Sequence, residues 1–291
     1  MSAPALGLVL LSTLFHAGWN LFAHTHRGDA GLFLRAALVA GLVGVAPALW
    51  LQFFGSPFPA LVWLLLPVTG FFQAVYLLGL FMGYRSGDFT VVYPVARALP
   101  VLILALADTL RGRSPTALGM LGMLLVTAGC LLAPLDSLHR LPWQRYRSRA
   151  LRWVWVTAGA TVGYTLVDKI ALERAPPGLL SAARYAGLQW FLAAPYLYAA
   201  LRWLIRAELP LGDGRQWRQA ALMALFVVGA YIPILWVYQL TSRASYVVAL
   251  RQFSIVLGVV GGILIFHEPA ARLRLVAALL ITAGIALVSV G

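Results

Sequence analysis

The triplet Thr127-Ala128-Gly129 recurs 155 positions later as Thr282-Ala283-Gly284, and this repeat decides the fold. At the same shift Tyr76 falls on Tyr231. Each half of the chain contains five hydrophobic segments. Because five is odd, the second half must enter the bilayer in the opposite direction to the first. Inverted repeats of this kind are typical of secondary transporters, in which a substrate site lies between the repeats near the bilayer midplane.

The composition is that of a membrane protein. Apolar residues make up 62% of the chain and charged residues 11%, whereas a soluble domain is nearer half apolar and a quarter charged. About 18 apolar residues with few charges suffice to cross the hydrocarbon as a helix. The sequence predicts an all-α integral membrane protein of ten transmembrane helices, arranged as two inverted five-helix repeats. The expected spans are 4–24, 29–52, 60–84, 88–108, 115–134, 150–172, 178–201, 217–240, 244–266 and 272–290.

The polar stretch between the halves divides the chain into domains. We expect residues 1–135 to form the first five-helix repeat, 136–149 a basic cytoplasmic linker and 150–291 the second, inverted repeat. Arginine is more frequent in the odd-numbered loops, and cytoplasmic loops collect Lys and Arg. This asymmetry predicts a multi-pass protein of the inner (plasma) membrane with both termini outside.

Several function classes are excluded by what the sequence lacks. The net charge of +13 is dispersed over short loops, which argues against a nucleic-acid partner. Cys130 is the only cysteine, so there is no intramolecular disulfide and no cysteine metal cluster. The chain has no Walker loop, no HExxH motif and no Gly-x-Ser-x-Gly elbow. We therefore expect no enzymatic activity, no cofactor and no metal.

Four arginines remain inside the predicted spans: Arg35, Arg97, Arg184 and Arg251. Each costs roughly 2.5–3.5 kcal/mol at a helix centre, so each must find partners, face a cavity or serve function. For Arg35 and Arg184, near span ends, structural pairing and function stay equally open. Arg97 and Arg251 lie near the middle of spans four and nine, which correspond under the repeat.

Arg97 stands between Pro94 and Pro100. Because proline removes a backbone donor, the segment Tyr93–Arg97 is predicted to be a discontinuous helix that carries a charge into a cavity. The natural partner of Arg97 would be Asp168, the only acid that lies clearly inside a predicted span. One acid cannot neutralise four arginines, and the excess positive charge favours an anionic or carboxylate-bearing substrate.

Polar and aromatic residues recur at equivalent depths in both halves, in a pattern that predicts a central pocket lined by spans one, three, four, six, eight and nine. Span one offers His16, Trp19 and Asn20, and span six offers Tyr164, Thr165 and Asp168. Spans three and eight contribute Gln73, Tyr76, Tyr231 and Trp236.

These motifs, in this order, resemble the EamA-like ten-span members of the drug/metabolite transporter superfamily over essentially the whole chain. The matching motifs are His16–Asn20, Gly87-Asp88, Tyr93–Arg97, Tyr164–Asp168, Arg251-Gln252 and His267-Glu268-Pro269. In the first half, Arg113 replaces the usual acid of the last motif. Gln252 stands where relatives often carry an acid, which disfavours proton coupling at that position. Relatives are usually drawn with both termini inside, opposite to the orientation that the arginines predict.

The resemblance implies a gradient- or exchange-driven carrier of a small metabolite that works by alternating access. Its partners are then the substrate and the lipid bilayer, and it would be a monomer or homodimer. Candidate substrate-binding residues are Arg97, Arg251, Trp19, Asn20, Gln73, Tyr76, Tyr93, Asp168, Tyr231, Trp236 and Gln252. Candidate coupling or gating residues are His16, Asp168 and Glu268. The alternative is a flippase or carrier for a phosphorylated lipid or lipid-linked sugar.

Overall fold

The structure is a computed structural model that describes residues 1–26, 29–85, 89–133, 149–266 and 272–291. Within these ranges the chain forms helices and no strand. The helices are α1 Ala3–Thr25, α2 Ala30–Phe54, α3 Ala60–Arg85, α4 Phe89–Leu110, α5 Ala117–Leu132, α7 Arg149–Leu172, α8 Leu179–Ala199, the π-helical turn η2 Ala200–Leu204, α9 Gly214–Leu240, α10 Ala244–Arg251, α11 Phe253–Phe266 and α12 Arg272–Val290.

All ten predicted spans are helical, and their ends fall within about one turn of the expected positions. Three of the helices begin at side-chain caps that the sequence supplies. Asp29 accepts from Leu32 N before α2, Thr116 accepts from Gly119 N before α5, and Asp213 forms a capping box with Gln216 before α9. Such caps satisfy amide groups that have no partner within the helix.

The outer surface of the bundle is apolar. Five helical stretches in the described residues are long and apolar enough to cross a membrane: Ala3–Ala23, Ala30–Phe54, Ala60–Gly83, Gly214–Leu240 and Arg272–Val290. Leu64 and Phe53 are 70% and 77% exposed. A soluble protein rarely exposes so much continuous apolar surface, whereas hydrocarbon is its natural surrounding.

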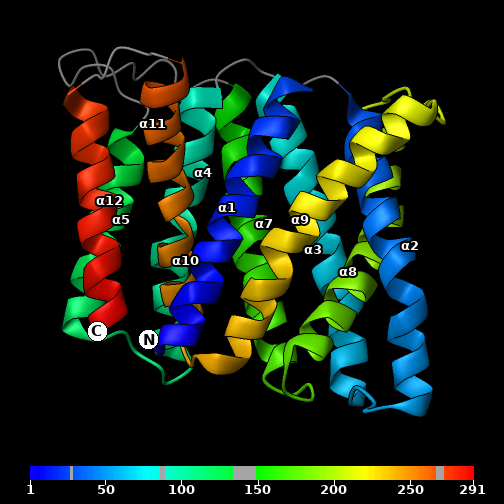
Figure 1. The fold of residues 1–291 in the computed structure, drawn as a ribbon, viewed down its shortest axis with the longest axis horizontal. Coiled ribbons are helices and arrows are strands. Elements are labelled where there is room, and N and C mark those ends of the chain that lie inside the picture. The colour runs from blue at the N-terminus through cyan, green and yellow to red at the C-terminus, as the bar shows by residue number, and fades with distance from the viewer. Residues whose placement is uncertain (27–28, 86–88, 134–148, 267–271) are drawn as a thin grey trace.

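The two halves run in opposite directions, as predicted. In Figure 1, α1 rises from the end of the bundle that holds both termini, whereas α7, the first helix of the second half, descends toward it. We call this end the terminal face. The turns at residues 55–59, 111–116, 173–178 and 241–243 also lie there.

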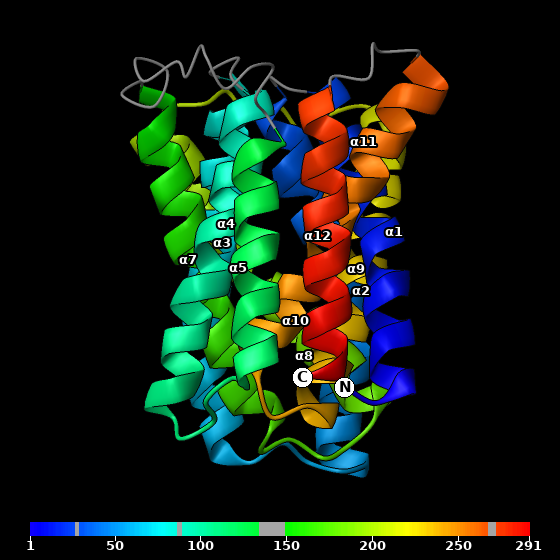
Figure 2. The same ribbon diagram turned by 90° about the vertical axis from the view of Figure 1, so that its left-hand side faces the viewer.

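Helix packing has the symmetry of a twofold axis between the halves. α3 packs on α7 and α1 packs on α9, and exchanging the halves converts one pair into the other. α2 packs on α8, and α5 packs on α12. Exchanging the halves leaves each of these two pairs unchanged, so we call these helices self-paired. The self-paired helices form the two ends of the bundle, with α5 and α12 side by side at one end (Figures 1 and 2).

Both self-paired contacts depend on glycine. A Cβ added at Gly44 of α2 would lie 2.4 Å from the Cα of Gly187 in α8. A Cβ added at Gly122 of α5 would lie 2.6 Å from the carbonyl oxygen of Gly284 in α12. Small residues let membrane helices approach until backbone touches backbone.

Arg35 and Arg184 make similar structural contacts, one in each half. Arg35 of α2 pairs with Asp29 at 2.8 Å and donates to the Pro210 carbonyl at 3.3 Å, in the loop before α9. Arg184 of α8 donates to the Ser56 carbonyl at 2.7 Å, in the turn before α3. Each arginine therefore ties its half to a loop of the other, and structural pairing accounts for both.

The domain boundaries 1–135, 136–149 and 150–291 stay predictions, as does the cytoplasmic side of the linker. The linker lies outside the described residues except for Arg149, which begins α7.

Candidate functional site

Two adjoining cavities lie between the halves, with volumes of about 30 and 20 Å³. We call them together the chamber. The first is lined by His16, Tyr76, Leu80, Ala96, Arg97, Thr157, Thr161, Tyr164, Val248, Arg251 and Gln252. The second is lined by His16, Trp19, Gln73, Tyr76, Leu77, Tyr164, Trp190, Val227, Ala230, Tyr231 and Arg251. One water molecule needs about 10–15 Å³ by this measure, so the chamber in this conformation holds only a few waters.

Arg97 and Gln252, which are equivalent under the 155-residue shift, contact each other across the interface of the halves. Arg97 Nε donates to Gln252 Oε1 at 2.7 Å, and Gln252 Nε2 donates to the Arg97 carbonyl at 3.3 Å. In a twofold arrangement, equivalent residues meet only near the axis. The arginine of α4 therefore lies close to the pseudosymmetry axis of the bundle.

The helix break lies in span nine and not in span four. The prediction of a discontinuous helix at Tyr93–Arg97 is wrong, because α4 runs unbroken from Phe89 to Leu110. The predicted ninth span is instead divided at Gln252 into α10 and α11.

Side chains at the break explain why it occurs without proline or glycine. The Arg251 carbonyl accepts from Arg97 Nη2 at 2.9 Å and from Ser254 Oγ at 3.0 Å. The amide of Ile255, which would bond this carbonyl in a regular helix, bonds the Gln252 carbonyl instead. Insertion of a side chain into the backbone ladder is a known cause of helix interruption.

His16 lies between the two arginines. Its Nε2 contacts Arg97 Nη1, and its Nδ1 lies 3.3 Å from Arg251 Nη2 and 3.0 Å from the indole nitrogen of Trp19. A neutral imidazole has one acceptor nitrogen. His16 can therefore accept a hydrogen bond from only some of the N–H donors around it.

Three buried polar atoms of the second cavity lack hydrogen-bond partners: Arg251 Nε, Trp190 Nε1 and Gln73 Oε1. Two are donors and one is an acceptor. No Asp or Glu is among the residues that line the two cavities, so the lining carries the positive charge of Arg97 and Arg251 without a carboxylate.

Aromatic rings form a continuous edge-to-face chain around the chamber. Trp19 meets Tyr76 at a centroid distance of 6.4 Å, Tyr76 meets Tyr164 at 5.5 Å, and Tyr164 meets Tyr231 at 5.9 Å. The Arg251 guanidinium lies 5.9 Å from the centre of the Tyr231 ring. These rings give the cationic chamber flat apolar walls.

The expected ion pair between Asp168 and Arg97 is absent, which corrects that prediction. Asp168 is fully buried and accepts from Thr69 Oγ1 at 2.5 Å, from the Tyr185 hydroxyl at 2.8 Å, from Gln189 Nε2 at 3.2 Å and from the Tyr231 hydroxyl. The partners come from α3, α8 and α9. Asp168 itself lines neither cavity.

The remaining candidates divide into three groups. Trp19, Gln73, Tyr76, Arg97, Tyr231, Arg251, Gln252 and His16 line the chamber. Asn20 donates to the His16 carbonyl at 2.6 Å, and Trp236 packs on the hydrophobic core; neither lines a cavity. The side chain of Tyr93 and the whole of Glu268 lie outside the described residues. As substrate-binding or coupling residues, all of them stay predictions.

Residues 150–290 match the model of the EamA-like transporter family. The second half of the chain is an EamA-like transporter domain. The protein is accordingly a multi-pass membrane transporter of small molecules. A crystal structure described only as "Crystal structure of protein" shares the fold over 100% of this chain and 99% of that chain, with a TM-score of 0.69 and 18% identity. No curated protein matches the sequence.

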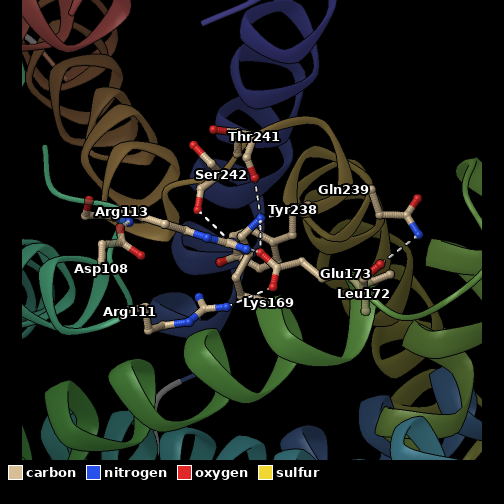
Figure 3. Close-up of polar contacts among 11 residues, drawn as sticks. Asp108, Arg111, Arg113, Lys169, Leu172, Glu173, Tyr238, Gln239, Thr241 and Ser242 are labelled. Carbon is tan, nitrogen blue, oxygen red and sulfur yellow. Dashed lines mark hydrogen bonds and ion pairs between the residues drawn. The ribbon is translucent and has the colours of Figure 1, made fainter.

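The protein has a second polar cluster that the sequence did not reveal, at the terminal face (Figure 3). The terminal cluster comprises Arg111, Arg113, Lys169 and Glu173. Glu173 accepts from Arg111 at 2.8 Å and from Lys169 at 2.9 Å, and it also pairs with Arg113. Lys169 lies within α7 and is only 1% exposed.

The terminal cluster joins the two halves of the protein. Lys169 Nζ donates to the Tyr238 carbonyl at 2.6 Å and also to the Thr241 carbonyl, at the end of α9. Arg113, in the α4–α5 turn, donates to the Ser242 carbonyl at 3.2 Å. One carboxylate thus holds cations from a first-half turn and from a second-half helix.

The contacts of the terminal cluster lower the pKa of Glu173. Burial by itself raises the pKa of Glu173, but hydrogen bonds from Lys169 and Arg113 and the charges of Lys169 and Arg111 outweigh it, so that the pKa lies below its ordinary value. A depressed carboxyl pKa stabilises the folded contact above the unfolded-state pKa. The contribution is lost as the pH falls through the depressed pKa.

Asp108 is a further buried acid, so Asp168 is not the only one inside a span. It is fully buried near the end of α4, and its Oδ2 accepts from Ser245 N at 2.8 Å. Because Ser245 lies in the first turn of α10, Asp108 caps a helix of the other half. No group of three His, Cys, Asp or Glu in the described part of the chain is placed to hold a metal ion.

Proposed function

We propose that the protein carries a small organic anion, carboxylate-bearing or of similar charge, by alternating access between the halves. The observation that supports it best is the Arg251 side chain, 6% exposed, with its Nε unpartnered in a chamber whose lining contains no acid. Polar groups buried without partners are costly, and the oxygens of an anion in the second cavity would supply acceptors for the two unpartnered donors, Arg251 Nε and Trp190 Nε1. The aromatic walls suit a flat apolar part.

This conformation fits one state of an alternating-access cycle, the state in which the terminal face is closed. On α7, Thr157, Thr161 and Tyr164 line the chamber and Lys169 follows further along the helix, while Glu173 comes directly after its last residue, Leu172. At 1.5 Å per residue, the terminal cluster lies beyond the chamber and joins the halves on that side. Opening toward the terminal face then requires these ion pairs to separate, while the small chamber widens around the substrate.

Ligand-dependent thermal unfolding in detergent tests the proposed substrate class. We expect benzenesulfonate and benzoate to raise the unfolding temperature in a concentration-dependent way, because a ligand that binds only the folded state stabilises it. The matched neutral amides, benzenesulfonamide and benzamide, have the same ring and should have little effect. Stabilisation by polyprenyl phosphates alone would overturn the proposal in favour of a lipid carrier, and equal effects of acids and amides would also contradict it.

Replacing Glu173 by glutamine is expected to open the terminal face more often, because Arg111, Arg113 and Lys169 lose their shared carboxylate. Partly exposed ion pairs contribute up to roughly 1 kcal/mol, or about a fivefold change in population. The measurement uses a cysteine at Val248, which lines the chamber, in a Cys130→Ala background. A membrane-impermeant maleimide added on the terminal side should label it several-fold faster in the Glu173→Gln variant.

Glu208→Gln is the matched control, because Glu208 is an exposed acid in the loop between η2 and α9, away from the terminal cluster. It should leave the labelling rate unchanged. Equal labelling rates for Glu173→Gln and the parent protein would remove the terminal cluster from the gating mechanism.

A further inference from the structure

The groups that hydrogen-bond Asp168 can do so whether its carboxyl is ionised or protonated. Thr69, Tyr185 and Tyr231 contribute hydroxyls, and Gln189 contributes an amide. A hydroxyl donates to a carboxylate and can also accept from a carboxylic acid, whereas Lys or Arg can only donate. The network therefore differs from an ordinary buried ion pair, which accepts only the ionised acid.

Gln189 provides the acceptor that a protonated Asp168 would need. Its Nε2 lies 3.2 Å from both carboxylate oxygens and 2.6 Å from Thr69 Oγ1, while its Oε1 is buried without a partner. A half-turn of the amide places Oε1 where Nε2 now lies. In that position Oε1 accepts the proton of a neutral carboxyl, so both charge states of Asp168 are satisfied with little movement.

Tyr231 connects this network to the chamber. Its hydroxyl donates to Asp168, its ring lies 5.9 Å from the Arg251 guanidinium, and it lines the second cavity. A proton from chamber water therefore reaches the carboxyl through one hydroxyl. An anion held at Arg251 would therefore be separated from the Asp168 network by the Tyr231 side chain alone.

We propose that Asp168 is the proton-binding site of the carrier, and that a proton bound there travels together with the anion. The inference rests on the proposed function. A negative substrate and a negative carboxylate near one chamber repel each other, so occupation of the anion site favours protonation of Asp168. The coupling is reciprocal: a bound proton strengthens anion binding by the same factor.

Other titratable and charged groups face Asp168 from the elements around it. They are Tyr185 on α8 and Tyr231 and Tyr238 on α9. Tyr164 on α7 and Arg251 on α10 lie against the ring of Tyr231. His16, between the arginines, is the other group in the chamber able to take up a proton. A decisive test must separate Asp168 from His16.

Proton uptake on ligand binding is measured with a pH indicator, using purified protein in weakly buffered detergent and benzenesulfonate as the probe. Benzenesulfonate stays ionised throughout, so any proton that disappears from solution has bound to the protein. We expect wild type to take up as much as roughly one proton per bound anion. Asp168→Asn should take up none, and Asp168→Glu, which keeps a carboxyl, should retain uptake.

Asp108→Asn is the matched control, because Asp108 is equally buried but caps α10 and lies outside the chamber. It should bind the probe with wild-type proton uptake. His16→Gln separates the two candidate groups. Uptake that persists in Asp168→Asn, or that is lost in His16→Gln although the probe still binds, would overturn the inference.

The pH dependence of probe affinity in wild type gives a second readout that requires no variant. Because binding takes up a proton, affinity should rise as the pH falls from about 8 to about 5, by up to roughly tenfold per pH unit. An affinity independent of pH would contradict the proposed proton site but not the proposed transport of an anion. Failure of wild type to bind benzenesulfonate at all would instead overturn the proposed function, and the inference with it.

Discussion

Arg251→Gln is expected to reduce the uptake of benzenesulfonate into proteoliposomes by about 30-fold or more. Truncating one partner of a buried, hydrogen-bonded charge pair costs roughly 2–5 kcal/mol, and the amide cannot replace the charge that holds an anion in a chamber without acids. Arg251→Lys keeps the charge but loses the planar guanidinium, so it should retain part of the activity. Uptake is measured over time at equal amounts of reconstituted protein.

Arg97→Gln should lose uptake to a similar degree and also lower the unfolding temperature. The reason for the second effect is that Arg97 holds the Arg251 carbonyl and Gln252 at the break between α10 and α11. Arg202→Gln, an exposed arginine of η2, serves as the control and should transport like wild type. If correctly folded Arg251→Gln protein carries the probe at the wild-type rate, the chamber is not the anion site.

Gly44→Leu is expected to prevent normal assembly of the bundle, and Gly44→Ala to destabilise it by about 1–3 kcal/mol, the usual cost of overpacking. Even the single added carbon would lie 2.4 Å from the Cα of Gly187, and a Cβ added at Gly187 would likewise lie 2.6 Å from the Cα of Gly44. Backbone atoms on the facing helix cannot rotate away as a side chain can. Thermal unfolding in detergent and the monodisperse yield after purification measure the effect.

Gly159→Ala is the matched control for this substitution. Gly159 also lies within a long helix, α7, but an added Cβ there meets nothing within 4 Å. Alanine has a higher helix propensity than glycine, so this variant should be as stable as wild type or slightly more so. Equal unfolding temperatures for Gly44→Ala and Gly159→Ala would show that α2 and α8 do not cross at this contact.

Features that depend on local sequence were predictable. A span is specified by its own apolar residues, because hydrocarbon requires every backbone group to bond within the helix. The 155-residue repeat makes Arg97 and Gln252 equivalent positions, and these two side chains touch in the structure. Several polar and aromatic side chains that line the chamber, on α1, α3, α4, α9 and α10, were named from the sequence because polar groups are rare at that depth. Their role in substrate binding stays a prediction.

Features that depend on which helix faces which were not predictable. Asp168 was expected to pair with Arg97 because opposite charges attract, yet its neighbours from α3, α8 and α9 are hydroxyls and an amide. Lys169 is its immediate neighbour in sequence, but it points to carbonyls at the end of α9. Adjacent residues on a helix face about 100° apart, so packing assigns them to different sites.

By itself the sequence determined a membrane-spanning, all-helical chain with two inverted halves and a cationic centre. Hydrophobicity, repeat register and charge depend only on the identity and position of each residue, so they can be read without a structure. Only the tertiary structure decided that the helix break falls at Gln252, where the inserted Arg97 side chain takes a backbone carbonyl. It also decided that Glu173 gathers three cations from both halves. Such contacts join groups far apart in the chain, and their energy exists only once the helices have packed.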